Sequence, residues 1–86
     1  MKQTNHYRLL KTALDNGTLG PIRNITRIVP VTVLTRDMRL NYNTTSKRLL
    51  DPGKLTATDI LRLSKLAGVT PADVLKLIVQ EITRPN

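Results

Sequence analysis

Apolar side chains recur every three or four residues along most of this 86-residue chain, which is the spacing of one face of an α-helix. The first such stripe consists of Tyr7, Leu10 and Leu14. Thr4 or Asn5 is available as the N-cap of this segment, and Gly17 suits the left-handed position that closes a helix. We therefore predict a helix over about residues 4–16, followed by a turn up to Pro21.

A second stripe lies between two prolines and contains Ile22, Ile25, Ile28 and Val29. It must stop before Pro30, because the residue that precedes a proline disfavours helix geometry. Pro30 itself suits the first turn of a new helix, where its missing N–H is not needed. The stretch 28–35 is rich in β-branched residues, so an extended strand is the alternative. The internal proline and the lack of a partner strand favour a helix over about 30–38.

The next segment is predicted to be a helix over about residues 41–50. Asn41 is its cap, and Thr45 and Leu49 share its inner face. The Pro52-Gly53 pair that follows requires the helix to end by Asp51.

The C-terminal third contains the same start signal twice, fourteen residues apart. Thr56-x-x-Asp59 and Thr70-x-x-Asp73 both have the form of a capping box, each flanked by an apolar pair in hydrophobic-staple positions. Two helices that obey the same start rule, or an internal duplication, would explain the match. Either explanation predicts a helical hairpin over about 56–83. The whole chain is then a single all-α domain, 1–86, a compact bundle of five or six short helices.

Charge is distributed unevenly along the chain. Fourteen Lys and Arg against six Asp and Glu give a net charge of +8. Ten basic and three acidic residues precede position 55, so that +7 of this charge lies in the first two thirds. A basic surface of this density favours polyanionic partners. There is no cysteine, no apolar run long enough for a membrane span and no signal-peptide pattern, so we expect a cytoplasmic protein without disulfides.

Enzyme chemistry has little support in these residues. His6 is the only histidine, and the acidic residues are scattered, with Asp59 and Asp73 already explained as helix-start groups. Neither a glycine-rich phosphate loop nor metal-ligand spacing is present. We expect no catalytic activity, no metal site and no cofactor.

The junction Met38-Arg39-Leu40-Asn41 carries the most information. A helix ends in an apolar residue, one residue turns, a second apolar residue tucks in, and a small polar residue caps the next helix. This order is typical of a helix-turn-helix. At the predicted helical spacing the outward positions of the second helix are Asn43, Thr44, Lys47 and Arg48, with Tyr42 at its leading edge.

Residues 30–78 resemble the Cro/Xre-type, lambda-repressor-like helix-turn-helix family. The resemblance lies in Leu34, Met38 and Leu40 around the turn, in the run 41–49, in the run 51–56, and in the helix 60–69. It implies sequence-specific binding of duplex DNA, usually by a regulator and often by a homodimer. Four positions depart from the family pattern: Thr35 stands where Ala is typical, Arg39 where Gly is typical, and Thr45 and Arg48 where apolar residues are common.

The resemblance also implies roles for the outward residues. The second helix would enter the major groove, with Tyr42, Asn43, Thr44 and Lys47 at base edges. Arg36, Arg48 and Lys54 would meet phosphates, which gives affinity without sequence information. Each position also has a simpler explanation. The charged residues are typical of a solvated helix face, and Asn43 and Thr44 are typical of the first turn of a helix. Tyr42 is typical of a residue that covers the edge of a core.

The last helix is more apolar than a surface helix requires. Its apolar residues span an arc of roughly 200°, against the 100° or a little more of a one-sided helix. The surplus would pack against a second copy, or else cover the helix 4–16 in the same chain. A two-fold dimer would present its two reading helices about 34 Å apart, one turn of DNA. The main alternative is a basic helical module that binds an acidic protein and reads no DNA sequence. RNA binding by stacking is less well supported, because the chain has only two aromatic residues.

Overall fold

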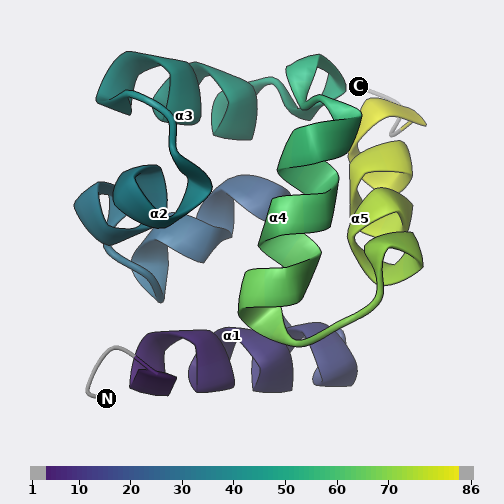
Figure 1. The fold of residues 1–86 in the computed structure, drawn as a ribbon. Coiled ribbons are helices and arrows are strands. Elements are labelled where there is room, and N and C mark those ends of the chain that lie inside the picture. Colours follow the sequence, from purple (N-terminus) through teal and green to yellow (C-terminus); the bar gives the residue numbers. More distant parts are fainter. Residues whose placement is uncertain (1–3, 84–86) are drawn as a thin grey trace.

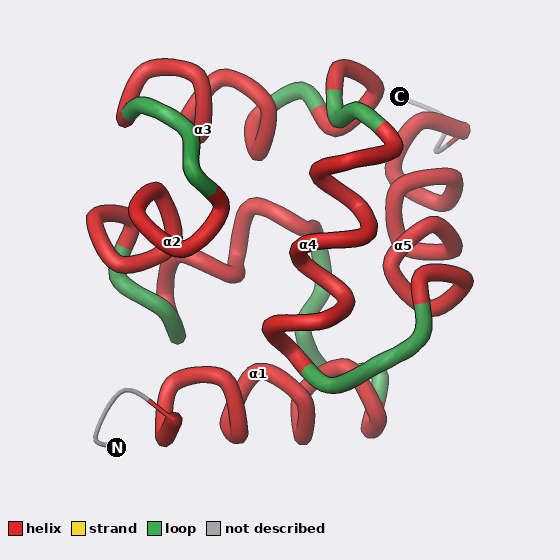
Figure 2. Tube along the Cα trace, in the orientation of Figure 1, coloured by secondary structure: helices red, strands yellow, loops and turns green. Residues whose placement is uncertain are grey.

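The computed structural model describes residues 4–83, and every regular element in that range is helical (Figures 1 and 2). In chain order the elements are α1 (Thr4–Asn16), η1 (Ile22–Arg27), α2 (Val31–Met38), α3 (Tyr42–Leu50), η2 (Pro52–Lys54), α4 (Ala57–Ala67) and α5 (Pro71–Thr83), where η denotes a 3-10 helix. The predicted all-α bundle is therefore confirmed. The strand considered for residues 28–35 is wrong, because α2 occupies most of that stretch.

Local signals place most helix ends where the sequence predicts them. Three helices end in the same backbone motif, in which a left-handed residue follows the last helical one: Gly17 after α1, Arg39 after α2 and Gly68 after α4. After α4, for example, the Gly68 N–H donates to the Lys65 carbonyl at 3.3 Å and the next N–H donates to the Ser64 carbonyl at 3.0 Å. Such Schellman bonds satisfy carbonyls that the helix leaves open. The proposed caps of α1, Thr4 and Asn5, lie outside the residues whose side chains are described.

Both predicted capping boxes form. In α4 the Thr56 hydroxyl accepts from the Asp59 N–H at 3.1 Å, and the Asp59 carboxylate accepts from the Thr56 N–H at 3.0 Å. In α5 the corresponding bonds between Thr70 and Asp73 measure 3.2 and 3.4 Å. Each helix start is thus fixed by residues within one turn. The two helices pack against each other as the predicted hairpin.

The segment before α2 differs in detail from the expectation. Ile22–Arg27 forms a 3-10 helix, with bonds such as the Asn24 N–H to the Pro21 carbonyl at 2.9 Å. Short segments of this kind commonly connect longer helices. Pro30 is the N-cap of α2 and not its first helical residue.

One hydrophobic core lies between the helices, with α4 in the middle. Helix α4 packs against α1, α2 and α5, and Figure 1 shows α2 and α5 on opposite sides of it. The buried apolar residues of this core are Leu10, Leu19, Ile22, Ile25, Val29, Leu34, Met38, Leu49, Leu63, Ala67, Val74 and Ile78. Within residues 4–83, none of the helices has the length and the apolar content that a membrane span requires.

Candidate nucleic-acid interface

Helices α2 and α3 are joined by the predicted sharp turn at Arg39. This residue has φ 60° and ψ 41°, and among the described residues it alone has a positive φ without being glycine. Its N–H donates to the Arg36 carbonyl at 3.2 Å, and the Leu40 N–H donates to the Thr35 carbonyl at 3.0 Å. These bonds close α2 and direct the chain into α3 within three residues.

The start and the inner face of α3 agree with the sequence prediction. The Asn41 side chain accepts a hydrogen bond from the Thr44 N–H at 2.7 Å, which makes it the N-cap. Thr45 and Leu49 are buried, and the Thr45 hydroxyl donates to the Asn41 carbonyl at 3.0 Å. The hydroxyl is thus satisfied within its own helix, so that burying Thr45 leaves no unpaired donor.

Three of the predicted reading residues of α3 are exposed and unpaired: Asn43 and Lys47 on its outer face, and Tyr42 on the flank that faces Val31. Tyr42 is 54% exposed, and Asn43 and Lys47 are exposed as well. None of the three side chains makes a hydrogen bond or an ion pair within the described part of the chain. Thr44 is half-buried, and its N–H is already engaged by Asn41. Helix α3 therefore presents an amide and an ammonium on its outer face and a phenol on its flank, and all three groups can bond to base edges or phosphates.

The two flanking cations, Arg36 and Lys54, are also accessible. The Arg36 side chain is 64% exposed and lies 3.1 Å from the carboxylate of its neighbour Asp37. Exposed pairs of this kind are weak, so Arg36 remains available to a phosphate. Lys54 is exposed at the end of η2 and has no charged partner among residues 4–83.

Arg48 is not the outward, free cation that the sequence predicts. Its side chain is only 28% exposed, and its Nη1 lies 2.7 Å from Oδ2 of Asp59, which is 2% exposed. A buried carboxylate needs a positive partner, and Arg48 is close enough to supply it. The prediction that Arg48 points outward toward phosphate is therefore wrong; its charge is used inside the protein.

A second polar contact connects α1 to α2. The Tyr7 hydroxyl donates to the Asp37 carboxylate at 2.6 Å. This bond is the largest of the effects that lower the pKa of Asp37, and Arg36 adds to it. Burial, followed by the same bond, raises the pKa of the Tyr7 phenol well above its ordinary value. This bond ties α1 to α2, and Figure 1 shows α1 and α3 at opposite ends of the molecule.

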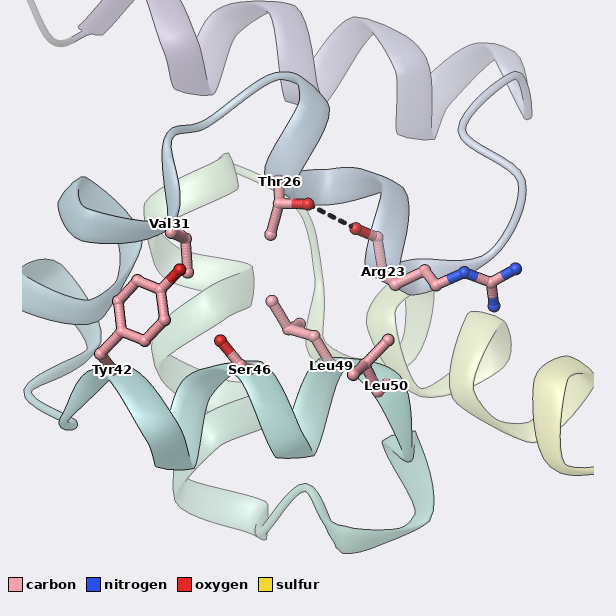
Figure 3. A pocket seen from close by; sticks show the side chains of 7 residues that line it. All are labelled: Arg23, Thr26, Val31, Tyr42, Ser46, Leu49 and Leu50. Carbon is pink, nitrogen blue, oxygen red and sulfur yellow. Dashed lines mark hydrogen bonds between the residues drawn. The ribbon is translucent and has the colours of Figure 1, made fainter.

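A groove of about 210 Å³ runs along one flank of α3 (Figure 3). Tyr42, Ser46 and Leu50 line it from α3, and Thr26 and Val31 line it from the opposite side. The Thr26 hydroxyl is bound to the Arg23 carbonyl at 3.0 Å, and the Arg23 guanidinium points away from Tyr42 (Figure 3). The tyrosine ring thus extends from the start of α3 along an open groove and is not part of the core.

Comparison with protein-family models, with curated protein sequences and with solved structures finds no match for this chain. In residues 4–83 no three His, Cys, Asp or Glu side chains come together in a way that would hold a metal ion.

The apolar surplus of α5 is exposed. Leu75, Val79 and Ile82 follow one another at i, i+4 and i+7 and are 48%, 48% and 58% exposed. The alternative that these side chains cover helix 4–16 is therefore wrong. We call these three side chains the α5 stripe; helix α5 itself lies on the side of α4 opposite to α2 (Figure 1).

The sequence did not reveal the part that two residues play at this site. Asp59 is explained by its capping box, and only the fold shows that its buried carboxylate also holds Arg48. For Arg39 the sequence predicts only the turn, although its side chain is exposed and unpaired within the described residues. The signal available for Arg39 was the presence of a charged residue at a turn position where glycine is expected. For Asp59 no local signal existed.

Proposed function

We propose that this protein binds duplex DNA in a sequence-specific manner and regulates transcription, as the resemblance to the Cro/Xre-type helix-turn-helix family implies. The observation that supports the proposal best is the α2–Arg39–α3 arrangement. It leaves Asn43 and Lys47 exposed and unpaired on the outer face of one short helix, and the exposed Tyr42 on the flank of the same helix. An amide can bond adenine through two atoms, and an ammonium can bond the O6 and N7 atoms of guanine.

Electrostatics support the same proposal. The positive charge is concentrated before residue 55, and four accessible cations lie on or beside the helix-turn-helix: Arg36, Arg39, Lys47 and Lys54. Contacts of Arg36 and Lys54 with phosphates would orient α3 in the major groove, whereas Asn43 and Lys47 would read bases. Arg48 is left out of this assignment because Asp59 holds it.

Selection of bound duplexes from a random pool at about 150 mM salt tests the proposal. We expect an enriched motif. Asn43→Ala should then relax the preference at one base pair by about 1–3 kcal/mol. Arg36→Ala and Lys54→Ala should weaken binding to all sequences and lower the salt slope by about 1 each. Lys76→Ala, which removes an exposed lysine from α5, is the matched control and should change neither.

Binding that shows no enrichment and disappears as salt rises would contradict the proposal and leave a basic helical domain. The α5 stripe favours the second candidate function, a module that binds another protein. Such a module would be indifferent to the duplex sequence, and its important residues would be Leu75 and Val79 rather than Asn43 and Lys47.

We further propose that the α5 stripe joins two copies of this chain. Two molecules of charge +8 repel each other, and the last 32 residues carry only +1, so the α5 surface is where two copies approach at the lowest electrostatic cost. Sedimentation equilibrium should show a dimer that Leu75→Glu converts to a monomer, because a two-fold axis places each substitution in the contact twice. An inverted repeat in the selected DNA would support the same arrangement. A monomeric wild-type protein that selects single half-sites would contradict it.

A further inference from the structure

Helix α4 makes a hydrogen bond to each of the two helices of the helix-turn-helix. Toward α2, Nη1 of Arg62 donates to the carbonyl oxygen of Met38 at 2.9 Å, across 24 positions of the sequence. Met38 is the last residue of α2, and the left-handed Arg39 follows it. The last carbonyls of a helix have no partner within the helix and form the negative end of its dipole, so Arg62 binds where a cation is most effective.

Toward α3, the contact is the ion pair of Asp59 with Arg48. The same carboxylate oxygen, Oδ2, accepts from Nη1 of Arg48 at 2.7 Å and from the Thr56 N–H at 3.0 Å. Asp59 is buried and Arg48 lies in the last turn of α3. The capping box therefore orients the carboxylate that holds the far end of α3.

Asp59 and Arg62 are three residues apart on α4 and thus lie on the same side of it. The rest of α4 packs against α1 and α5, which makes it a fixed support. The turn between α2 and α3 is short, and its left-handed residue is an arginine, which disfavours that conformation. A strained residue of this kind persists where the surrounding structure holds it.

From these contacts we infer that α4 sets the angle between α2 and α3, with Arg62 and Asp59 as positioning residues. Arg62 fixes the end of α2 at the turn, and Asp59 fixes the end of α3. The effect of these residues on DNA binding rests on the proposed function. Their effect on the α2–α3 angle of the free protein does not depend on it.

The first experiment therefore uses the full chain without DNA. Residual dipolar couplings measured by solution NMR give the orientation of α2 relative to α3. Arg62→Met keeps the aliphatic stem and removes the donor, and Asp59→Asn keeps a capping oxygen and removes the charge. We expect both variants to change the orientation of α2 and α3 or to spread it over several angles, while α1, α4 and α5 keep theirs.

The chain offers a matched control for each variant. Lys65→Met removes an exposed cation from the same helix, and Asp73→Asn makes the same change in the second capping box, where no arginine is bound. Neither control should change the α2–α3 angle. If Arg62→Met does not fold, Arg62→Lys tests the same bond, because it keeps a donor and should keep the wild-type angle. The inference would be overturned if the α2–α3 angle is unchanged in Asp59→Asn and also unchanged in Arg62→Met. It would likewise be overturned if the angle is unchanged in Asp59→Asn but changed in Arg62→Lys.

The second experiment measures affinity for the selected duplex as a function of salt. Arg62→Met should weaken binding by a factor of about 10 to 100, the range that corresponds to one charge-assisted hydrogen bond. Its salt slope should stay unchanged, since no phosphate contact is lost. A slope lower by about 1 would mean that Arg62 touches phosphate, and the positioning role would be wrong. If the wild type selects no duplex, the proposed function fails, and the NMR result alone still decides the role of α4.

Discussion

Arg39 occupies a backbone conformation that a glycine would adopt more easily, and Arg39→Gly should stabilise the protein. At φ 60° the Cβ of a non-glycine residue approaches the following carbonyl, which costs about 1–2 kcal/mol. Glycine adds about 0.5–1 kcal/mol of backbone entropy to the unfolded chain. The difference predicts a net gain of about 0.5–1 kcal/mol in the free energy of unfolding. The Arg39 side chain is exposed and unpaired among residues 4–83, so no contact is lost to reduce this gain.

The structure contains its own reference for this prediction. Helices α1 and α4 end in the same hydrogen-bond motif as α2, with Gly17 and Gly68 in the left-handed position. The three sites therefore differ mainly in whether a Cβ is present. Because the hydrogen bonds are the same at all three sites, we attribute the cost at Arg39 to its left-handed backbone conformation and not to a different turn geometry.

Urea unfolding followed by circular dichroism measures the effect. In urea, the slope of the free energy of unfolding against urea concentration should stay unchanged. In a thermal scan, the expected gain should raise the midpoint of unfolding by about 2–8 °C for a domain of this size. Arg39→Ala keeps the Cβ and removes the charge, so its stability should stay within about 0.5 kcal/mol of the wild type. An alanine variant as stable as the glycine variant would show that charge repulsion, not backbone strain, is relieved, and a destabilised glycine variant would refute the reasoning outright.

Three further predictions concern stability. Gly17→Ala is the inverse test: a Cβ there would meet no atom within 4 Å, so no steric clash contributes. The expected loss of about 0.5–1 kcal/mol, read from urea unfolding, is the backbone strain less the entropy that alanine removes from the unfolded chain, and an unchanged stability would contradict this. Thr35→Val should stabilise by about 1 kcal/mol, because the Thr35 hydroxyl is buried without a hydrogen-bond partner and valine keeps its shape; a loss of stability would indicate that the hydroxyl has a partner after all. Tyr7→Phe removes the main hydrogen bond that lowers the pKa of Asp37. A carboxylate whose pKa is lower in the folded than in the unfolded protein stabilises the fold. For Asp37 this stabilisation is complete above the ordinary pKa of 3.8 and is lost as the pH falls through the lowered pKa of the folded protein. Thermal unfolding of the wild type and Tyr7→Phe should therefore differ most near neutral pH and converge as the pH falls below the lowered pKa of Asp37, and a constant difference would show that Asp37 is not involved.

The sequence alone determined the helices and most of their ends. Asn41, the Thr56–Asp59 pair and Gly68 act on backbone groups no more than four residues away, so their effect is independent of the rest of the fold. The same is true of the inner face of α3, where the spacing of Thr45 and Leu49 is set by the pitch of a single helix. For these features the chain needs no tertiary context.

The tertiary structure decided which polar groups find each other. Arg48 and Lys47 are adjacent, both basic and both on α3, yet one is bound to a buried carboxylate eleven positions away and the other is free. The bond from Arg62 to the Met38 carbonyl was equally beyond prediction. For the last helix the sequence left two alternatives open, and only the fold shows that the α5 stripe is exposed. Pairing across the fold depends on how the helices pack, and packing is set by the combined shape of the whole core, which the local spacing of residues does not encode.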